Sequence, residues 1–158
     1  MFDTAVESTY VWLGLAVVSA GILGFALRVP TAPPPDAKPV AHTIDSVAAS
    51  PHEATARHPV DARGIRIGAH RVGLRGPGGD AHASLAYGPV VRVAGGDGDR
   101  LRRVLRGVPP ERVFRSESTF ARVLDRSRTT EPSWRPAPET LLVRRVSWGD
   151  TNATLVGA

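Results

Sequence analysis

Histidine and aspartate are the residues of this sequence whose types could support metal binding or acid–base chemistry. No two histidines are four residues apart, the spacing that places two metal ligands on one helix face, and none lies in an H-E-x-x-H pattern. Asp80, His82 and Ser84 alternate and would share one face of a strand, but a catalytic triad also needs a base that a third group orients in a pocket. The sequence therefore predicts no catalytic residue, no metal site and no cofactor. The histidines are His42, His52, His58, His70 and His82.

Two glycine-rich segments invite comparison with ligand-binding loops. Residues 95–99 have the composition of a calcium-binding Gly-Asp loop, but the nonapeptide motif needs Asp where Arg100 stands, and it needs repetition. Residues 76–79 lack the Lys-Ser/Thr ending of a phosphate-binding loop. We therefore expect both segments to be turns.

Arginine dominates the second half of the chain. The sequence contains no cysteine, which excludes disulfides and thiolate metal sites. Residues 100–145 contain 12 arginines and only 5 acidic residues. This excess predicts a basic face for an acidic partner or anionic lipid. Nucleic acid is not expected, because aromatic residues are sparse here and no nucleic-acid-binding module is recognisable. The expected basic face comprises Arg102, Arg103, Arg106, Arg122, Arg126, Arg144 and Arg145.

Periodicity predicts the elements that must position these residues. Val40, Ile44 and Val47 indicate a short amphipathic helix, and residues 52–61 are expected to form a loop. Alternation from Gly64 to residue 93 predicts an antiparallel meander.

The rest of the domain is predicted as two helices followed by a hairpin. Asp99 and Ser116 are suitable N-caps for the helices, and Gly107 suits a left-handed helix stop. Residues 141–148 and 151–156 are predicted to pair through a turn at Gly149.

Residues 10–27 contain no charged side chain and are long enough for a helix that crosses a bilayer. A cleaved signal peptide is disfavoured, because no basic residue precedes the stretch and no A-x-A-like pattern follows it. Tyr10 and Trp12 are expected at the membrane interface. Small residues four apart predict a helix-association face of Ala16, Ala20 and Gly24, through which the chain could form a homo-oligomer.

The sequence contains two opposing signals for the orientation of this expected anchor. Arg28 and Lys38 follow the span and favour a cytoplasmic domain. Asn152 begins an N-glycosylation acceptor pattern and favours an external one. We predict a single-pass protein of the cell membrane with an extracellular domain.

The predicted fold class is α+β: one transmembrane helix, a proline-rich tether and a small antiparallel-sheet domain with two or three short helices. The expected boundaries are an acidic tail at 1–9, the transmembrane helix at 10–27, the tether at 28–39 and the soluble domain at 40–158.

Five runs carry a resemblance to a known family: YVWLG, PTAPPPD, IDSVAASP, LRGVPPERVF and RRVSWGDTNATLVGA. They resemble an uncharacterised family of small haloarchaeal single-span membrane proteins. The resemblance implies pilin-like accessory components of archaeal type IV pilus or secretion-type systems, and it implies no catalytic residues.

These observations favour a non-enzymatic, membrane-anchored accessory or minor subunit of an archaeal surface assembly. Its expected partners are the lipid bilayer and other membrane or surface-assembly subunits. Two alternatives stay open: a cytoplasm-facing adaptor whose Arg-rich half binds anionic lipid or an acidic partner, and an anchored enzyme of unknown class.

Overall fold

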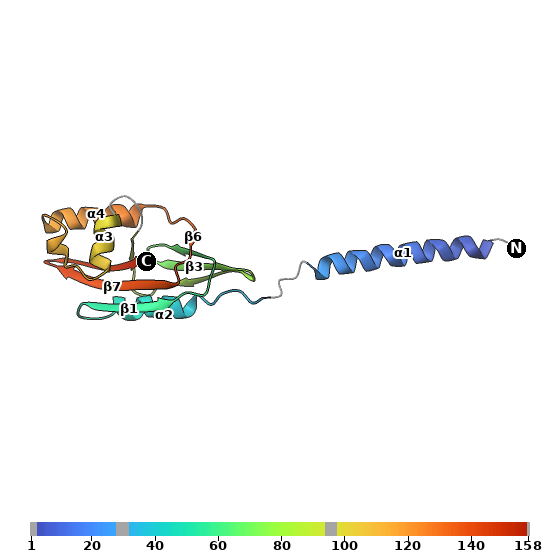
Figure 1. Ribbon diagram of the computed structural model, residues 1–158, viewed down its shortest axis with the longest axis horizontal. Helices are drawn as coiled ribbons and strands as arrows, with labels where there is room; N and C mark the ends of the chain where they lie inside the picture. Colours follow the sequence, from blue (N-terminus) through green and yellow to red (C-terminus); the bar gives the residue numbers. More distant parts are fainter. Residues whose placement is uncertain (1–2, 28–31, 94–97, 158) are drawn as a thin grey trace. The chain divides into compact units, whose positions relative to one another are not determined.

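The computed structural model of the chain describes residues 3–27, 32–93 and 98–157 (Figure 1). The chain divides into two compact units, Met1–Pro33 and Pro34–Ala158. The first unit contains one helix, and the second contains all of the described strands. Residues 28–31 of the expected tether lie outside the described residues.

The first unit is built on helix α1, Asp3–Ala26. Its described side chains, at residues 10–25, are all exposed, and the large apolar ones range from Leu15 at 54% to Phe25 at 75%. Within the described part of the chain, no helix is both long and apolar enough to cross a membrane. The predictions of a transmembrane helix over residues 10–27 and of a single-pass protein of the cell membrane are therefore corrected.

Sheet A of the second unit contains four strands in the order β1-β7-β8-β5. They are β1 Ala54–Pro59, β7 Thr140–Trp148, β8 Thr151–Gly157 and β5 Val91–Arg92. Strands β7 and β8 form an antiparallel hairpin, whose turn contains Gly149 at a φ of +59°, a conformation that glycine adopts without steric cost. Strand β5 pairs with β8 in parallel.

Sheet B also contains four strands, in the order β4-β3-β2-β6. They are β4 Gly79–Ser84, β3 Arg71–Gly76, β2 Gly64–Ile67 and β6 Arg135–Pro136. Every pairing in this sheet is antiparallel. Along β3, Val72 and Leu74 are buried whereas Arg71 and Arg75 are exposed, so the sheet has an inner and an outer face.

The helices of the second unit cover both faces of sheet A (Figure 1). They are α2 Lys38–Ala48, α3 Gly98–Leu105, the 3-10 turn η1 Pro110–Arg112 and α4 Glu117–Thr129. Helix α2 packs on one face and contacts sheet B as well, while α3 and α4 pack on the other. The Ser116 hydroxyl caps α4 by accepting from the Thr119 N–H at 3.3 Å.

Two apolar cores result from this arrangement. The first, around Ile44, Val72 and Val143, fills the space between α2 and the two sheets. The second, around Phe120 and Val146, fills the space between sheet A and helices α3 and α4. Because side chains alternate along a strand, neighbouring residues of β7 point into different cores.

Several predicted elements are confirmed. The helix around residues 40–49 is α2, the helix that follows Ser116 is α4, and the carboxyl-terminal hairpin is β7–β8. The meander is confirmed as β2–β3–β4, but its expected last run up to residue 93 contains β5, which belongs to sheet A. The fold class is α+β, but with two sheets and a parallel pair, and residues 52–61 contain β1 where a loop was expected.

Candidate anion-binding site

A cavity of about 170 Å³ lies where strand β5 of sheet A, strand β6 of sheet B and helix α3 approach one another. Three arginines from these separate elements line it. Much of the remaining lining is apolar and comes from the inward side of β2 and from β7. The lining residues are Ile65, Ile67, Arg92, Val93, Arg102, Ser133, Arg135, Pro136, Pro138, Leu141 and Gly157.

Arg92 is half-buried, as is Arg102, whereas Arg135 is exposed. The residue next to Arg92, Val91, is fully buried in the second core, and alternation turns Arg92 to the opposite face of β5. Its Nη2 donates to the Glu131 carbonyl at 3.4 Å, whereas its Nη1 is buried and has no hydrogen-bond partner among the described residues. Burial lowers the pKa of the Arg92 guanidinium, and the positive charge of Arg135 lowers it further.

Arg135 and Arg102 bring two more positive charges to the cavity. Arg135 is placed by β6, where it lies opposite Ile65 of β2, and it has no ion-pair partner in the described part of the chain. Arg102 projects from α3 and pairs with Asp99 at 2.6 Å, so its charge is partly compensated. The Ser133 hydroxyl is a further possible donor in the lining.

The described lining of the cavity supplies hydrogen-bond donors for binding an anion. The described lining contains arginines and a serine but no carboxylate and no imidazole, so it provides no obvious general base. Arg92 and Arg135 repel each other, and one N–H donor of Arg92 is buried without a hydrogen-bond partner among the described residues. An anion between two such guanidinium groups stabilises them. The arrangement is therefore suited to an oxyanion.

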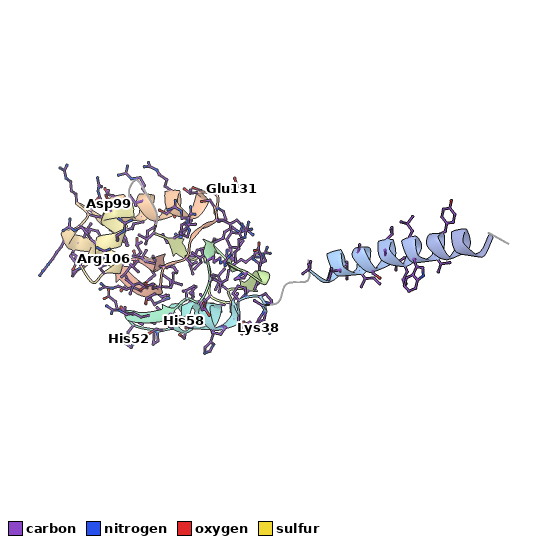
Figure 2. The ribbon with its side chains drawn as sticks, turned by 45° about the vertical axis from the view of Figure 1, so that its right-hand side comes forward. Lys38, His52, His58, Asp99, Arg106 and Glu131 are labelled. Atoms are coloured by element: carbon purple, nitrogen blue, oxygen red, sulfur yellow. The ribbon has the colours of Figure 1, made fainter. Side chains whose placement is uncertain are left out.

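The structure places the residues of the expected basic face in three settings: Arg102 lines the cavity, four are exposed, and Arg144 and Arg145 hold helices against sheet A. The exposed members lie on α4, on α3 or directly after it, in the layer that covers one face of sheet A. Arg106 is seen on the α3 side of the domain in Figure 2. These exposed residues are Arg103, Arg106, Arg122 and Arg126.

Arg144 and Arg145 are half-buried and anchor helices on opposite faces of sheet A. The Arg144 Nη1 donates to the Val104 carbonyl in α3 at 2.9 Å, and its Nη2 lies 3.4 Å from the Glu53 carboxylate. Arg145 Nη1 donates to the carbonyl of Ala48, the last residue of α2. Each cation satisfies a carbonyl at or near the carboxyl end of a helix, where positive charge is favourable. Both arginines hold a helix against sheet A and are half-buried, whereas the four residues above are exposed.

The remaining predicted site residues lie on β8 and α1 and do not line the cavity. Asn152 is exposed on β8, at the hairpin end opposite Ser147. Ala16, Ala20 and Gly24 lie on α1, as do the exposed Tyr10 and Trp12 that were expected at a membrane interface.

The histidines do not gather at one site. Figure 2 shows His52 and His58 on the α2 and β1 side, opposite Asp99 and Arg106. The His58 ring Nδ1 lies 2.8 Å from the Thr43 hydroxyl. Among the described residues, no group of three or more His, Asp or Glu side chains could hold a metal ion.

Asp80, considered above as a member of a triad, is engaged elsewhere. Its carboxylate forms a bidentate pair with Arg75, at 2.8 and 2.7 Å. His82 lies instead near the Trp134 ring, with ring centroids 6.0 Å apart, and Arg75 stacks over the same indole at 4.2 Å. Residues 95–97 of the glycine-rich loop lie outside the described residues.

Sequence reasoning missed Arg92 and Arg135 as functional candidates. One signal was present: Arg92 interrupts a run of three valines, Val90, Val91 and Val93, and an arginine within a buried strand needs a polar partner. Arg135 offers no such signal, because its neighbour at the cavity is more than forty residues away in the sequence.

The fold and site together describe an α+β protein with an arginine-lined cavity. The chain belongs to a family of unknown function, DUF7283, whose model matches residues 3–146. That match includes α1 and all three arginines of the cavity. No curated protein and no solved structure matched the chain. The family description contains no link to pilin-like proteins.

Proposed function

We propose that the second unit is a non-enzymatic binding domain that takes up an acidic ligand in the cavity of Arg92, Arg102 and Arg135. The observation that supports it is that Arg92 and Arg135 line one cavity, close enough for the charge of Arg135 to lower the pKa of Arg92, and that neither has a carboxylate partner in the described structure. Folding such a pair is unfavourable unless an anion compensates it. This proposal develops the Arg-rich adaptor hypothesis and gives it a specific site.

The test is the effect of anions on folding stability at constant ionic strength. A ligand that binds only the folded state raises the free energy of unfolding by about 1.4 kcal/mol at a concentration ten times its Kd. Benzoate or inorganic phosphate should therefore stabilise the full chain against urea, and Arg135→Gln should reduce the effect. Arg103→Gln is the matched control, because Arg103 is an exposed arginine of α3 outside the cavity. Equal stabilisation of the three proteins, or none, would contradict the proposal.

A second candidate function rests on α1. Its large apolar side chains are exposed, with Val11 at 70%, Leu13 at 63% and Ile22 at 65%. Helices that are apolar all round are normally covered by other structure. We propose that α1 associates with α1 of a second copy, which would make the protein an assembly subunit as the sequence suggested. The small residues of α1 favour close approach of two helix backbones, and Gly21 and Gly24 are open to a partner, since nothing in the described chain outside the neighbouring helix backbone lies within 4 Å of a Cβ added there.

Disulfide trapping tests this association, because the chain has no cysteine of its own. Ala20→Cys places a thiol on the small-residue face, and Val18→Cys places one about 200° around the helix as the control. We expect Ala20→Cys to form covalent dimers on mild oxidation and Val18→Cys to form few. Similar yields from both variants, or no dimer from either, would exclude a defined helix pair.

A further inference from the structure

The lining of the cavity indicates which class of acid it takes, an inference that rests on the binding function proposed above. The first observation concerns the hydrogen-bond donors of the cavity. Arg92 Nη1 is buried without a partner, and Arg135 has no ion pair in the described structure. A guanidinium group presents its N–H donors in a planar fork that matches the two oxygens of a carboxylate. Two guanidinium groups can thus hold one carboxylate from two sides.

The apolar part of the lining is the second observation. Ile65 and Ile67 are 5% and 6% exposed and belong to the first core, as does Leu141. These side chains contribute to the cavity wall alongside Val93 and Pro138. An inorganic anion is fully hydrated and gains nothing from such a surface, whereas an apolar group attached to the anion is removed from water by contact with it. The ligand should therefore have an apolar body as well as a charge.

The volume limits the size of that body. The cavity measures about 170 Å³. An engineered protein cavity of about 150 Å³ with aliphatic walls binds benzene. A six-membered ring, or a branched chain of similar size, therefore fits beside the arginines, and a larger acid would have to extend into solvent.

The geometry points to a small monocarboxylic acid with an apolar body about the size of a benzene ring. Its carboxylate lies between Arg92 and Arg135, with the Ser133 hydroxyl as an additional donor. Its ring or branched chain rests against Ile65, Ile67 and Leu141. Arg102 contributes to the positive potential, although Asp99 already compensates part of its charge.

Calorimetric titration of the full chain with four probes tests this assignment at constant pH and ionic strength. Benzoate has both the charge and the body, acetate has only the charge, benzamide has only the body, and inorganic phosphate has charge without an apolar surface. Benzoate should bind at least about tenfold more tightly than acetate, because each buried CH₂ equivalent contributes about 0.8 kcal/mol. Benzamide should not bind measurably.

Two variants connect the result to the cavity. Arg135→Gln keeps an exposed polar side chain on β6 and should weaken benzoate binding at least about tenfold, since hydrogen bonds to charged groups contribute about 1.5–3 kcal/mol. Arg92→Gln should have an effect at least as large. Arg103→Gln should leave the affinity unchanged. Benzoate binding that survives both cavity substitutions would overturn the assignment.

The outcomes separate this inference from the function on which it rests. Phosphate binding that depends on Arg135, with benzoate no tighter than acetate, would refute the apolar acid and leave the anion-binding function standing. A protein that binds neither benzoate, acetate nor phosphate would refute both. Tight benzoate binding that is lost in Arg135→Gln and absent for benzamide would support both.

Discussion

The middle of β7 and the two edge strands β5 and β6, one from each sheet, contain arginines in opposite circumstances. On β7, Arg144 and Arg145 donate to main-chain carbonyl groups, and each attaches a helix to one face of sheet A. At the cavity, Arg92 and Arg135 are close enough for the charge of one to lower the pKa of the other, and the buried Nη1 of Arg92 lacks a partner. A count of positive charges treats these four residues alike, whereas their hydrogen bonds separate structural arginines from those available to a ligand.

The difference follows from the position of each strand. The strand β7 has paired neighbours on both sides and is covered on both faces, so a charged side chain there must find a partner within the chain. The strands β5 and β6 contain two residues each and pair on one side only, which leaves their side chains beside a solvent-accessible cavity. Edge strands can therefore present charges that a central strand has to satisfy internally.

The largest effect is expected from removing the arginines of β7. Arg144→Met keeps the aliphatic part of the side chain but removes the charged hydrogen bond to the Val104 carbonyl, which then accepts, among the described residues, only from the Gly107 N–H, so the free energy of unfolding should fall by about 2 kcal/mol. Arg145→Met should have a similar effect through the Ala48 carbonyl. Because the two residues act on opposite faces and share no partner, the double variant should lose about 4 kcal/mol. Urea unfolding measures all three.

Arg103→Met is the control for these variants, since exposed arginines outside such networks change stability by about 0.5 kcal/mol or less. If Arg144→Met and Arg103→Met were equally stable, the division between structural and available arginines would be lost. If the double variant lost no more free energy of unfolding than either single variant, Arg144 and Arg145 would instead act as one unit.

A smaller effect of opposite sign is expected at the cavity. Arg135→Gln removes the like charge beside Arg92, so in the absence of ligand the free energy of unfolding should rise by about 0.5 kcal/mol after solvent screening is allowed for. Urea unfolding in low and high salt measures the gain, which should shrink as salt screens the repulsion. A loss of more than about 1 kcal/mol would show that Arg135 supports the fold, as Arg144 does.

The sequence predicted the elements whose signals are local. The Ser116 cap, the Gly149 turn and the helical spacing of Val40 and Ile44 depend on residues within one or two turns of chain, and the corresponding elements are present. Strand β1 was missed because Ala54–Pro59 has few β-forming residues and acquires its conformation by pairing with β7, more than eighty residues later.

The candidate site was less accessible to sequence reasoning than the fold. Arg92 and Arg135 line the same cavity only because β5 and β6, the edge strands of two different sheets, lie near each other. No local pattern in the sequence specifies that arrangement. The same limit applies to Arg144 and Arg145: the arginine excess placed both in one expected basic face, whereas strand alternation sends them to opposite faces of sheet A. Charge composition therefore predicted an excess of cations correctly without indicating which of them have partners.

The smallest effect concerns an arginine whose partner is a carboxylate. Hydrogen bonding to Asp80 raises the pKa of Arg75, the reverse of the direction for Arg92, and the same contact holds the pKa of Asp80 below its ordinary value. The pair is exposed, so its contribution to stability is small. Because the pKa of Asp80 is lower in the folded state, that contribution is complete above the unfolded-state pKa of about 3.9 and disappears as the pH falls through the folded-state value.

Titration of the Asp80 carboxyl by NMR measures this directly. In the wild type its midpoint should lie below the ordinary aspartate range, and Arg75→Gln should raise it toward that range. Arg71→Gln is the matched control, because Arg71 is an exposed arginine of the same strand without a described carboxylate partner. An Asp80 midpoint that Arg75→Gln does not change would mean that the general positive field of the domain, rather than this pair, lowers it. In that case partner geometry would not distinguish the arginines of this domain, and the contrast between β7 and the cavity would need another explanation.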